Sequence, residues 1–423
     1  MKIRASDSIF SHANVFIAVP LLSTAISAQA VETGFVEDST AGLNLRNYYI
    51  NRNYVSDSAT QSKAEAWSQA FILNYKSGFT QGLVGFGLDA MGLYAVKLDG
   101  GRGTPGTQLL PSHDDGQAAD DYGRLAIAGK VRISATELKV GEWMPTLPIL
   151  RSDDGRSLPQ TFRGAQVTSR EIENLTLYGG QFRANSPRND ASMDDMFLAQ
   201  KPGVFSDRFN FVGGEYTFND KRTLLGGWGA ELKDIYRQQM IQITHSQPIG
   251  TWTLGANVQW FTGKDDGRSL AGGLDNRTWS GLFSAMHGAN TFYIGLQKVS
   301  GQDGWMKVNG TSGGSLANDS FSSSYENANE RSWQVRHDYN FVALGVPGLV
   351  LMNRYIKGSG IHIGGETGVK EWGRETELAY VFQSGALKDL NIKWRNSTLR
   401  RGWGTHTSFN ENRLVLNYPF SLF

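Results

Sequence analysis

The chain has 423 residues and a nearly balanced charge, with 41 lysines and arginines against 40 aspartates and glutamates. This balance argues against nucleic acid as a main partner. The absence of cysteine excludes disulfides and thiolate chemistry.

The N-terminus has the features of an export signal. Lys2 and Arg4 precede an apolar stretch over residues 13–26, and Ala28-Gln29-Ala30 has the small-x-small form of a signal-peptidase site. The sequence therefore predicts a signal peptide over residues 1–30 and a mature domain over residues 31–423. The alternative, a membrane anchor, requires a longer uninterrupted apolar stretch.

The segment 251–261, TWTLGANVQWF, shows a pattern that recurs along most of the chain. Apolar residues from Trp252 to Trp260 occupy the even positions, and small or polar residues occupy the odd ones. This period of two predicts a strand with one apolar face. The two tryptophans bracket that face, where a lipid-facing strand meets the two interfaces of a membrane. Repeated segments of this kind are typical of transmembrane β-barrels.

Short turns and longer polar connections divide the mature chain into strands. The predicted short turns are at Ser77-Gly78, 134–136, 169–171, 219–222, 246–250, 287–290, 344–348 and 384–388. The predicted longer loops are 53–64, 97–122, 144–160, 184–206, 232–235, 263–276, 300–330, 358–373 and 397–410. This alternation predicts an all-β, antiparallel barrel of about eighteen strands, with long extracellular loops and short periplasmic turns. The weakest predicted strand is 161–168.

The alternation also places basic side chains in the lumen. In 389–396 the apolar residues occupy even positions, so Lys393 and Arg395 point inward. A cation on the lipid face at mid-depth costs about 2–4 kcal/mol, which favours this orientation. The same rule gives further inward cations: Arg46, Arg52, Arg124, Lys130, Arg132 and Arg413. Because a closed barrel makes its first and last strands neighbours, the sequence predicts one basic stripe along the wall.

Four segments are distinctive: 35–49 (FVEDSTAGLNLRNYY), 130–145 (KVRISATELKVGEWMP), 153–168 (DDGRSLPQTFRGAQVT) and 230–238 (AELKDIYRQ). In this order they resemble outer-membrane porin D, the OprD-like family of substrate-specific channels in Gram-negative bacteria. The resemblance covers the mature chain and implies a monomeric eighteen-stranded channel narrowed by inward-folded loops. It further implies a ladder of basic residues that guides carboxylate-bearing solutes. The ladder residues carried by the motifs are Arg46, Arg132, Arg163, Lys393, Arg395 and Arg413.

Acidic candidates lie in the loops. Asp153 and Asp154 belong to the loop 144–160, which the resemblance implies is folded into the pore. There we expect them to meet the ammonium group of a solute or a loop arginine such as Arg151 or Arg156. A second acidic cluster is either solvated or binds divalent cations at the cell surface; its members are Asp114, Asp115, Asp120 and Asp121.

The sequence thus predicts an outer-membrane porin for small carboxylate-bearing solutes, without cofactor, metal or enzymatic activity. The choice between amino acids and aromatic or other organic acids stays open. The main alternative is a barrel enzyme of the lipase or protease type, which needs a histidine beside a serine or carboxylate. A structural or adhesive barrel is a third possibility.

Other expected partners are outer-membrane lipid, lipopolysaccharide and the barrel assembly machinery, which recognises a C-terminal aromatic residue such as Phe423.

Overall fold

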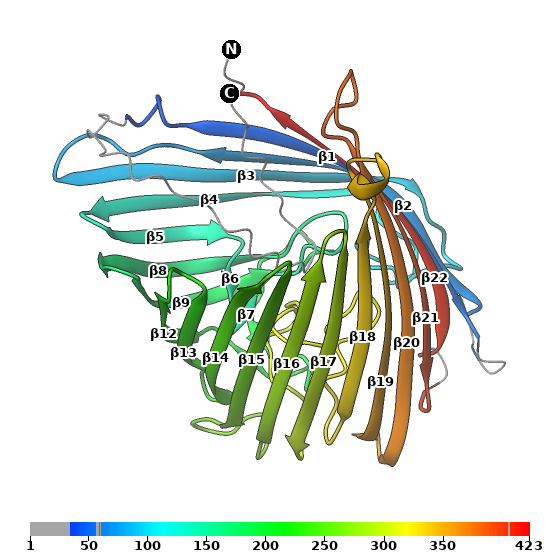
Figure 1. Ribbon diagram of the computed structural model, residues 1–423. Helices are drawn as coiled ribbons and strands as arrows, with labels where there is room; N and C mark the ends of the chain where they lie inside the picture. The colour runs from blue at the N-terminus through cyan, green and yellow to red at the C-terminus, as the bar shows by residue number, and fades with distance from the viewer. Residues whose placement is uncertain (1–33, 56–58, 60, 405–406) are drawn as a thin grey trace. The chain divides into compact units, whose positions relative to one another are not determined.

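The computed structural model describes residues 34–55, 59, 61–404 and 407–423. The predicted signal peptide, residues 1–30, lies outside them. Eighteen strands form one antiparallel sheet that closes because β1 (Thr40–Tyr54) pairs with both β2 (Lys63–Lys76) and β22 (Phe409–Ser421). Figure 1 shows this wall running from the blue first strands through green to the red last strand. The predicted all-β barrel of eighteen strands is therefore confirmed.

Closure satisfies the backbone hydrogen bonds of every strand, as a membrane interior requires. Between β2 and β22, the wall contains β3 (Val84–Asp99), β4 (Asp121–Ile133), β5 (Thr136–Trp143), β8 (Thr161–Ile172), β9 (Leu175–Ser186), β12 (Phe209–Phe218), β13 (Thr223–Leu232), β14 (Tyr236–Ile249), β15 (Trp252–Asp265), β16 (Asp275–His287), β17 (Asn290–Gly301), β18 (Arg331–Asn340), β19 (Leu349–Ile363), β20 (Glu366–Val381) and β21 (Asn391–Arg401). Shorter elements are not part of the 18-stranded sheet: β6 (Thr146–Leu147) paired with β7 (Leu150–Arg151), β10 (Met196–Phe197) paired with β11 (Phe205–Ser206), and the 3-10 helix η1 (Phe341–Leu344). Among the described residues, no helix combines the length and apolar character needed to cross a membrane.

Short turns alternate with longer connections, but the predicted loop 358–373 is wrong. There, β19 and β20 continue as paired strands and meet at a tight turn containing Gly364 and Gly365. Both glycines have positive φ, 59° and 87°, which a side chain would make unfavourable. The polar composition of this segment suggested a loop, because its strands carry charged residues on the outward side.

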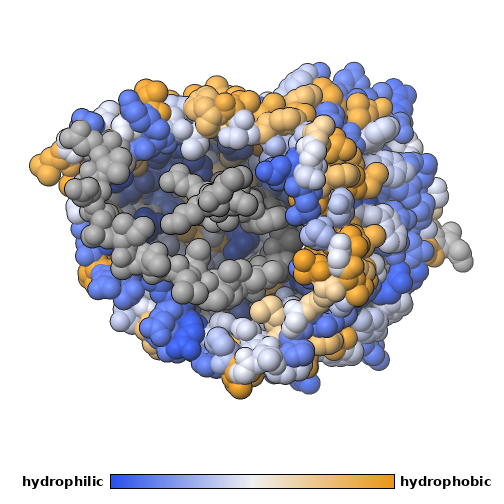
Figure 2. All heavy atoms as spheres, turned by 45° about the horizontal axis from the view of Figure 1, so that its top comes forward, coloured by the Kyte–Doolittle hydropathy of each residue, from blue (hydrophilic) through white to orange (hydrophobic). Residues whose placement is uncertain are grey.

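The two faces of the wall differ in chemistry, as the alternation predicts. On β14, Ile241 is 66% exposed on the outer face, whereas the neighbouring Met240 and Gln242 are buried on the inner face. Figure 2 shows hydrophobic residues over the outer wall and hydrophilic residues around and inside the opening. In a bilayer, the outer side chains therefore contact lipid, and the inner ones line the lumen.

Two long loops fold into the lumen: loop 3 (residues 144–160) and loop 7 (residues 302–330). Loop 3 reaches from β5 across to β2, where Ser157 Oγ lies 2.7 Å from Ser68 Oγ. The loops also contact one another, because Gln160 Nε2 of loop 3 donates to the backbone oxygen of Asn309 at 2.9 Å. Figure 1 shows β6 and β7 of loop 3 inside the wall, together with the yellow-green loop 7. The predicted inward folding of 144–160 is observed.

Apolar packing explains why these loops stay inside. Leu150 of loop 3 and Trp305 and Met306 of loop 7 are buried in one hydrophobic cluster with Phe182 and Phe261 of the wall. This cluster covers the inner faces of β9 and β12–β15. A buried side chain of this size contributes about 1.5–3 kcal/mol, so the cluster holds the loops on one side of the lumen.

Candidate functional site

Charged side chains gather on the part of the inner wall where the chain ends meet. Cross-strand register places Glu377 of β20 opposite Arg395 of β21, and Arg395 opposite Arg413 of β22. Lys393 lies two residues from Arg395 on the same face of β21. Arg46 lies on the adjoining β1, opposite Asn417. We call the following set the charged stripe: Arg46, Arg52, Lys393, Arg395 and Arg413 with Glu377 and Glu411.

The charged stripe is a network of ion pairs rather than a row of free cations. Arg395 Nε lies 2.5 Å from Glu377 Oε2. Glu411 accepts from two cations, because its Oε2 lies 2.8 Å from Arg52 Nη2 and its Oε1 lies 2.5 Å from Arg413 Nη2. One carboxylate thus serves two guanidiniums, so positive charge exceeds negative charge here. Arg413, Glu411 and Arg46 are all buried.

Two more wall arginines extend this arrangement, and the sequence analysis missed them. Arg336 on β18 lies opposite Arg354 on β19, and Arg354 lies opposite Glu375 on β20. Arg354 forms an ion pair with Glu375, and Arg336 Nη2 lies 2.5 Å from Asp338 Oδ2. The alternation of apolar residues indicates both arginines as inward, because Trp333, Val335 and Tyr355 occupy the outward positions of β18 and β19.

Loop 7 lies directly against the wall arginines. The ring of Phe321 is 5.5, 5.1 and 5.3 Å from the guanidinium carbons of Arg354, Arg395 and Arg413. Arg413 also donates to the backbone oxygen of Phe321 at 2.5 Å, and Arg354 donates to that of Asp319 at 3.1 Å. Part of the hydrogen-bonding capacity of these arginines is therefore used to hold loop 7.

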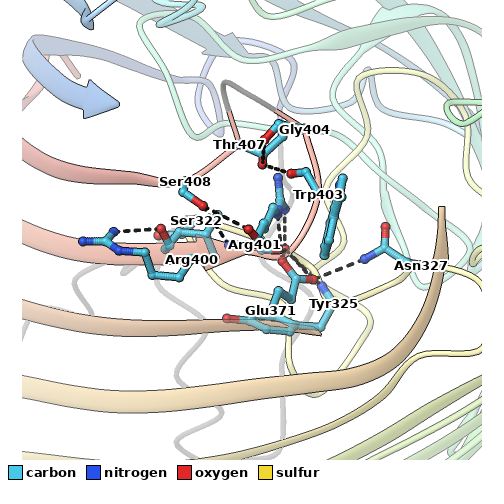
Figure 3. Close-up of polar contacts among 12 residues, drawn as sticks. Ser322, Tyr325, Asn327, Glu371, Arg400, Arg401, Trp403, Gly404, Thr407 and Ser408 are labelled. Atoms are coloured by element: carbon cyan, nitrogen blue, oxygen red, sulfur yellow. Dashed lines mark hydrogen bonds and ion pairs between the residues drawn. The ribbon is translucent and has the colours of Figure 1, made fainter. Parts of the chain in front are cut away.

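Loop 7 has a second anchor near the extracellular end of β20 and β21. Glu371 of β20 is fully buried and accepts from Arg401 of β21 at 2.8 Å and from Asn327 of loop 7 at 3.2 Å. Arg401 also donates to Ser323 of loop 7 at 2.8 Å. Figure 3 shows Arg401 and Asn327 directed toward the Glu371 carboxylate, with Trp403 beside Arg401. Burial raises the pKa of Glu330, the last residue of loop 7, well above its ordinary value.

The tip of loop 3 is held by arginines other than those expected. Asp154 pairs with Arg46 at 2.7 Å, and Asp153 pairs with Arg188 of the connection 187–208 at 2.7 Å. Although burial opposes the charged form, Arg188 contributes to holding the pKa of Asp153 below its ordinary value. These two ion pairs are made with a wall strand and a neighbouring loop rather than with Arg151 or Arg156, although the charge of Arg156 also helps to lower the pKa of Asp153.

Arg156 is the buried cation of loop 3 that lacks a carboxylate partner within the described residues. Its Nε donates to the backbone oxygen of Thr107 at 2.7 Å, and its Nη1 donates to that of Gly155 at 2.8 Å. Burial, with the nearby charges of Arg188 and Arg413, lowers the pKa of Arg156 to about 9. An anion that reached this guanidinium would stabilise its charged form and so offset both effects.

The predicted cations of β4 form a separate group, because β2 and β3 separate β4 from the charged stripe. Arg124 donates to the backbone oxygens of Pro187, Asp190 and Pro159, which ties two loops to the wall. The remaining predicted cations have other contacts. Lys130 pairs with Asp89 at 2.7 Å. The Arg132 guanidinium lies 4.1 Å from the Phe79 ring centroid. The side chain of Arg163 is 59% exposed, and its Nη2 lies 3.6 Å from Glu142 Oε2.

The acidic cluster at 114–121 forms ion pairs that are more exposed to solvent than those of the charged stripe. Asp115 pairs with Arg102 at 2.8 Å, and Asp120 pairs with Lys97 at 2.5 Å. The Asp120 side chain is 88% exposed. Exposed pairs of this kind contribute little energy, which favours the solvated interpretation of this cluster.

Comparison with known proteins identifies the family. A model described as "outer membrane porin, OprD family" matches residues 33–422. The chain is 64% identical to the porin-like protein GalP of Pseudomonas putida over 95% of this chain and 96% of that protein. It is similar to the crystal structure of a BenF-like porin from Pseudomonas fluorescens Pf-5, with 65% identity and a TM-score of 0.91 over 92% of this chain and 100% of that one.

Two similar structures from Pseudomonas aeruginosa contain ligands. OccK2 (OpdF) in complex with glucuronate is 60% identical with a TM-score of 0.86, and OpdK with vanillate is 50% identical with a TM-score of 0.87. Each comparison covers 92% of this chain and 100% of the other. Family model, relatives and barrel architecture agree across residues 33–422, and they confirm the location in the outer membrane. The chain belongs to the OprD family of outer membrane porins.

Proposed function

We propose that this porin passes small carboxylate-bearing solutes along the charged stripe and releases them chemically unchanged. The observation that carries the proposal is the excess of buried positive charge where loop 3 meets the wall. Arg156 has no carboxylate partner within the described residues, and Glu411 is shared by Arg52 and Arg413. An anionic group entering this region would reduce the repulsion between the guanidiniums.

The ion pairs suit passage better than tight retention. A guanidinium can bind a carboxylate through two parallel hydrogen bonds. Here each hydrogen bond to a solute would replace a hydrogen bond to Glu377, Glu411 or a loop 7 carbonyl. The net gain in binding free energy is therefore small. Conduction requires this balance, since a solute must be attracted into the pore and still leave each site. Neighbouring arginines on β21 and β22 would allow transfer from one cation to the next.

The ligands in the similar structures support the same chemical class. Glucuronate is a sugar acid and vanillate is an aromatic acid, and the carboxylate is the group that they share. The solute class proposed for this chain is therefore small organic acids, including amino acids, without a choice between aliphatic and aromatic members. The hydrogen bonds of His245 to Thr223, of His337 to Asn290 and of His362 to Asn329 join these three histidines to side chains other than a serine or a carboxylate.

The test compares a carboxylate with its neutral amide in proteoliposomes containing the purified barrel. Glucuronate and glucuronamide have similar size and differ in charge, so their relative entry rates report on the charged stripe. We expect faster entry of glucuronate in the wild type and a loss of that preference in Arg156→Gln. Equal rates for both solutes in the wild type would show that the pore is a size sieve. Hydrolysis of an ester or peptide by the purified barrel would instead support the enzyme alternative.

A further inference from the structure

The end of loop 7 inserts two side chains into a socket on the inner face of β19 and β20. Glu330 and Tyr325 are both 1% exposed. A β-carbon at Gly358 of β19 would overlap Glu330 Oε1, and a β-carbon at Gly373 of β20 would lie 2.6 Å from the Tyr325 hydroxyl oxygen. These two glycines therefore leave the space that the loop side chains fill. We call the site formed by Gly358, Gly373 and Glu371 the loop 7 socket.

Glu330 meets a second buried carboxyl group in the loop 7 socket, that of Glu371. Glu371 accepts hydrogen bonds from Arg401 of the wall and from Ser323 and Asn327 of loop 7 (Figure 3). Glu330 Oε2 accepts from the backbone and side-chain nitrogens of Asn327 at 3.1 and 2.8 Å. Its Oε1 is buried and receives no hydrogen bond from a described residue. An oxygen without a donor beside a charged carboxylate is where a proton is expected.

The surrounding charges leave Glu330 without a cation. The charged and titratable groups on the elements packed around it are, on loop 7, Tyr325, Glu326 and Lys307; on β19, Arg354 and His362; on β20, Glu371 and Glu375; and on β21, Arg401. Each arginine and lysine in this set pairs with another carboxylate of the set. The inward residues of β17 and β18 at this level, Val299 and Ser332, are uncharged.

Two buried carboxylates in contact cannot both carry a charge without a large cost in free energy. Burial and the neighbouring charge of Glu371 raise the pKa of Glu330 well above its ordinary value of 4.5. A protonated Glu330 can instead donate a hydrogen bond to the Glu371 carboxylate. Hydrogen bonds to an ionised acceptor are stronger than those between neutral groups. The protonated pair therefore favours the seated position of the loop.

We propose that Glu330 and Glu371 share one proton while the end of loop 7 is attached, and that loss of this proton to solvent releases residues 323–330 from the wall. Glu371 stays paired with Arg401 after release, so the wall keeps a compensated charge. The attachment is fully stabilised below pH 4.5, and this stability is lost as the pH rises through the raised pKa of Glu330. Between these two values, each pH unit increases the ratio of released to attached loop about tenfold. This latch does not depend on which solute the pore passes.

The test measures hydrogen–deuterium exchange of loop 7 peptides in the purified barrel at pH 5 and pH 8, normalised to the chemical exchange rate. The parent protein carries Asp319→Asn, which removes the other carboxyl group of loop 7 whose pKa burial raises. We expect residues 323–330 of the parent to exchange about tenfold faster, or more, at pH 8 than at pH 5. Adding Glu330→Gln should keep the loop attached at both pH values, because the neutral amide can still donate to Glu371. His362 is present in both proteins, so its titration cancels in the comparison.

Two further variants complete the test. Glu366→Gln makes the same chemical change in the exposed turn between β19 and β20 and should leave the pH dependence of the parent unchanged. Gly358→Ala should release residues 323–330 at both pH values, because the added methyl group excludes the Glu330 carboxyl group from the loop 7 socket. If Gly358→Ala does not fold, as judged by heat-modifiable migration in gels, Glu330→Gln decides alone. Equal exchange of the parent at the two pH values, or an unchanged pH dependence in Glu330→Gln, would overturn the proposal.

Discussion

Arg46 of β1 and Asp154 of loop 3 form a two-point ion pair, with Nη1–Oδ1 at 2.7 Å and Nη2–Oδ2 at 3.1 Å. Both side chains are buried, at 9% and 7% exposure. The pair fastens the tip of loop 3 to β1, which β2, β3 and β4 separate from β5, where the loop begins. The width of the passage beside the charged stripe therefore depends on this contact.

Breaking that pair should widen the pore. In Asp154→Ala the Arg46 guanidinium loses its carboxylate, and an uncompensated buried charge costs about 3–5 kcal/mol. Loop 3 should relieve this cost by leaving the wall, so we expect larger and noisier single-channel conductance in planar bilayers. Asp120→Ala, which removes an exposed ion pair, is the matched control and should leave conductance unchanged. Wild-type conductance in Asp154→Ala would mean that apolar packing alone positions loop 3.

Removing two cations of β21 should reduce entry of acids specifically. Lys393→Ala/Arg395→Ala should slow glucuronate several-fold, because each contact with a passing carboxylate is worth about 1 kcal/mol in a wet, screened lumen. Glucuronamide should enter at an unchanged or faster rate, since the pore becomes wider. Arg163→Ala, which removes an exposed cation outside the charged stripe, is the control. An equal slowing of both solutes would assign Lys393 and Arg395 a structural role.

Arg156 should determine the ion preference of the pore. Replacing it with glutamine keeps the hydrogen bonds to backbone oxygens possible but removes the charge. We therefore expect the reversal potential in a salt gradient to shift away from anion preference in Arg156→Gln, and to stay near the wild-type value in Arg156→Lys. A reversal potential that does not change in Arg156→Gln would show that this guanidinium does not face the permeating ions.

Asp319 should make the attachment of loop 7 depend on pH. Burial raises its pKa from 3.8 to about 6. A carboxyl group with a raised pKa favours the attached loop when protonated, so this stability is present below about pH 4 and is lost as pH rises through 6. Loop 7 should therefore be released more often at pH 8 than at pH 5, visible as more frequent current transitions. In Asp319→Asn, which stays uncharged, that difference between the two pH values should become smaller, and the part that stays is expected from Glu330, whose pKa is also raised by burial.

Alternation of apolar and polar residues predicted the barrel and the inward side chains of the charged stripe, because lipid and water impose opposite requirements on the two faces. The same rule predicts Arg336 and Arg354 as inward side chains. It does not predict which carboxylate pairs with which cation. The pairing of Asp154 with Arg46 connects residues 108 positions apart and depends on where loop 3 packs.

The loop 358–373 shows another limit of the sequence. Its charged residues suggested a connection, but β19 and β20 rise beyond the lipid and their outer side faces water or headgroups. At that height the apolar face disappears while the strand continues. The position of Phe321 could not be predicted from the sequence either. A single aromatic residue in a polar loop does not indicate that its ring contacts three arginines.

The fastening of loop 3 to one wall also has a stereochemical consequence. A solute beside the charged stripe would meet arginines of β21, β22 and β1 together with the tip of loop 3, which is fastened to the same part of the wall. Three points of contact that are not related by symmetry distinguish an object from its mirror image. The passage is therefore chiral, and the two enantiomers of a chiral acid have different free-energy profiles along it.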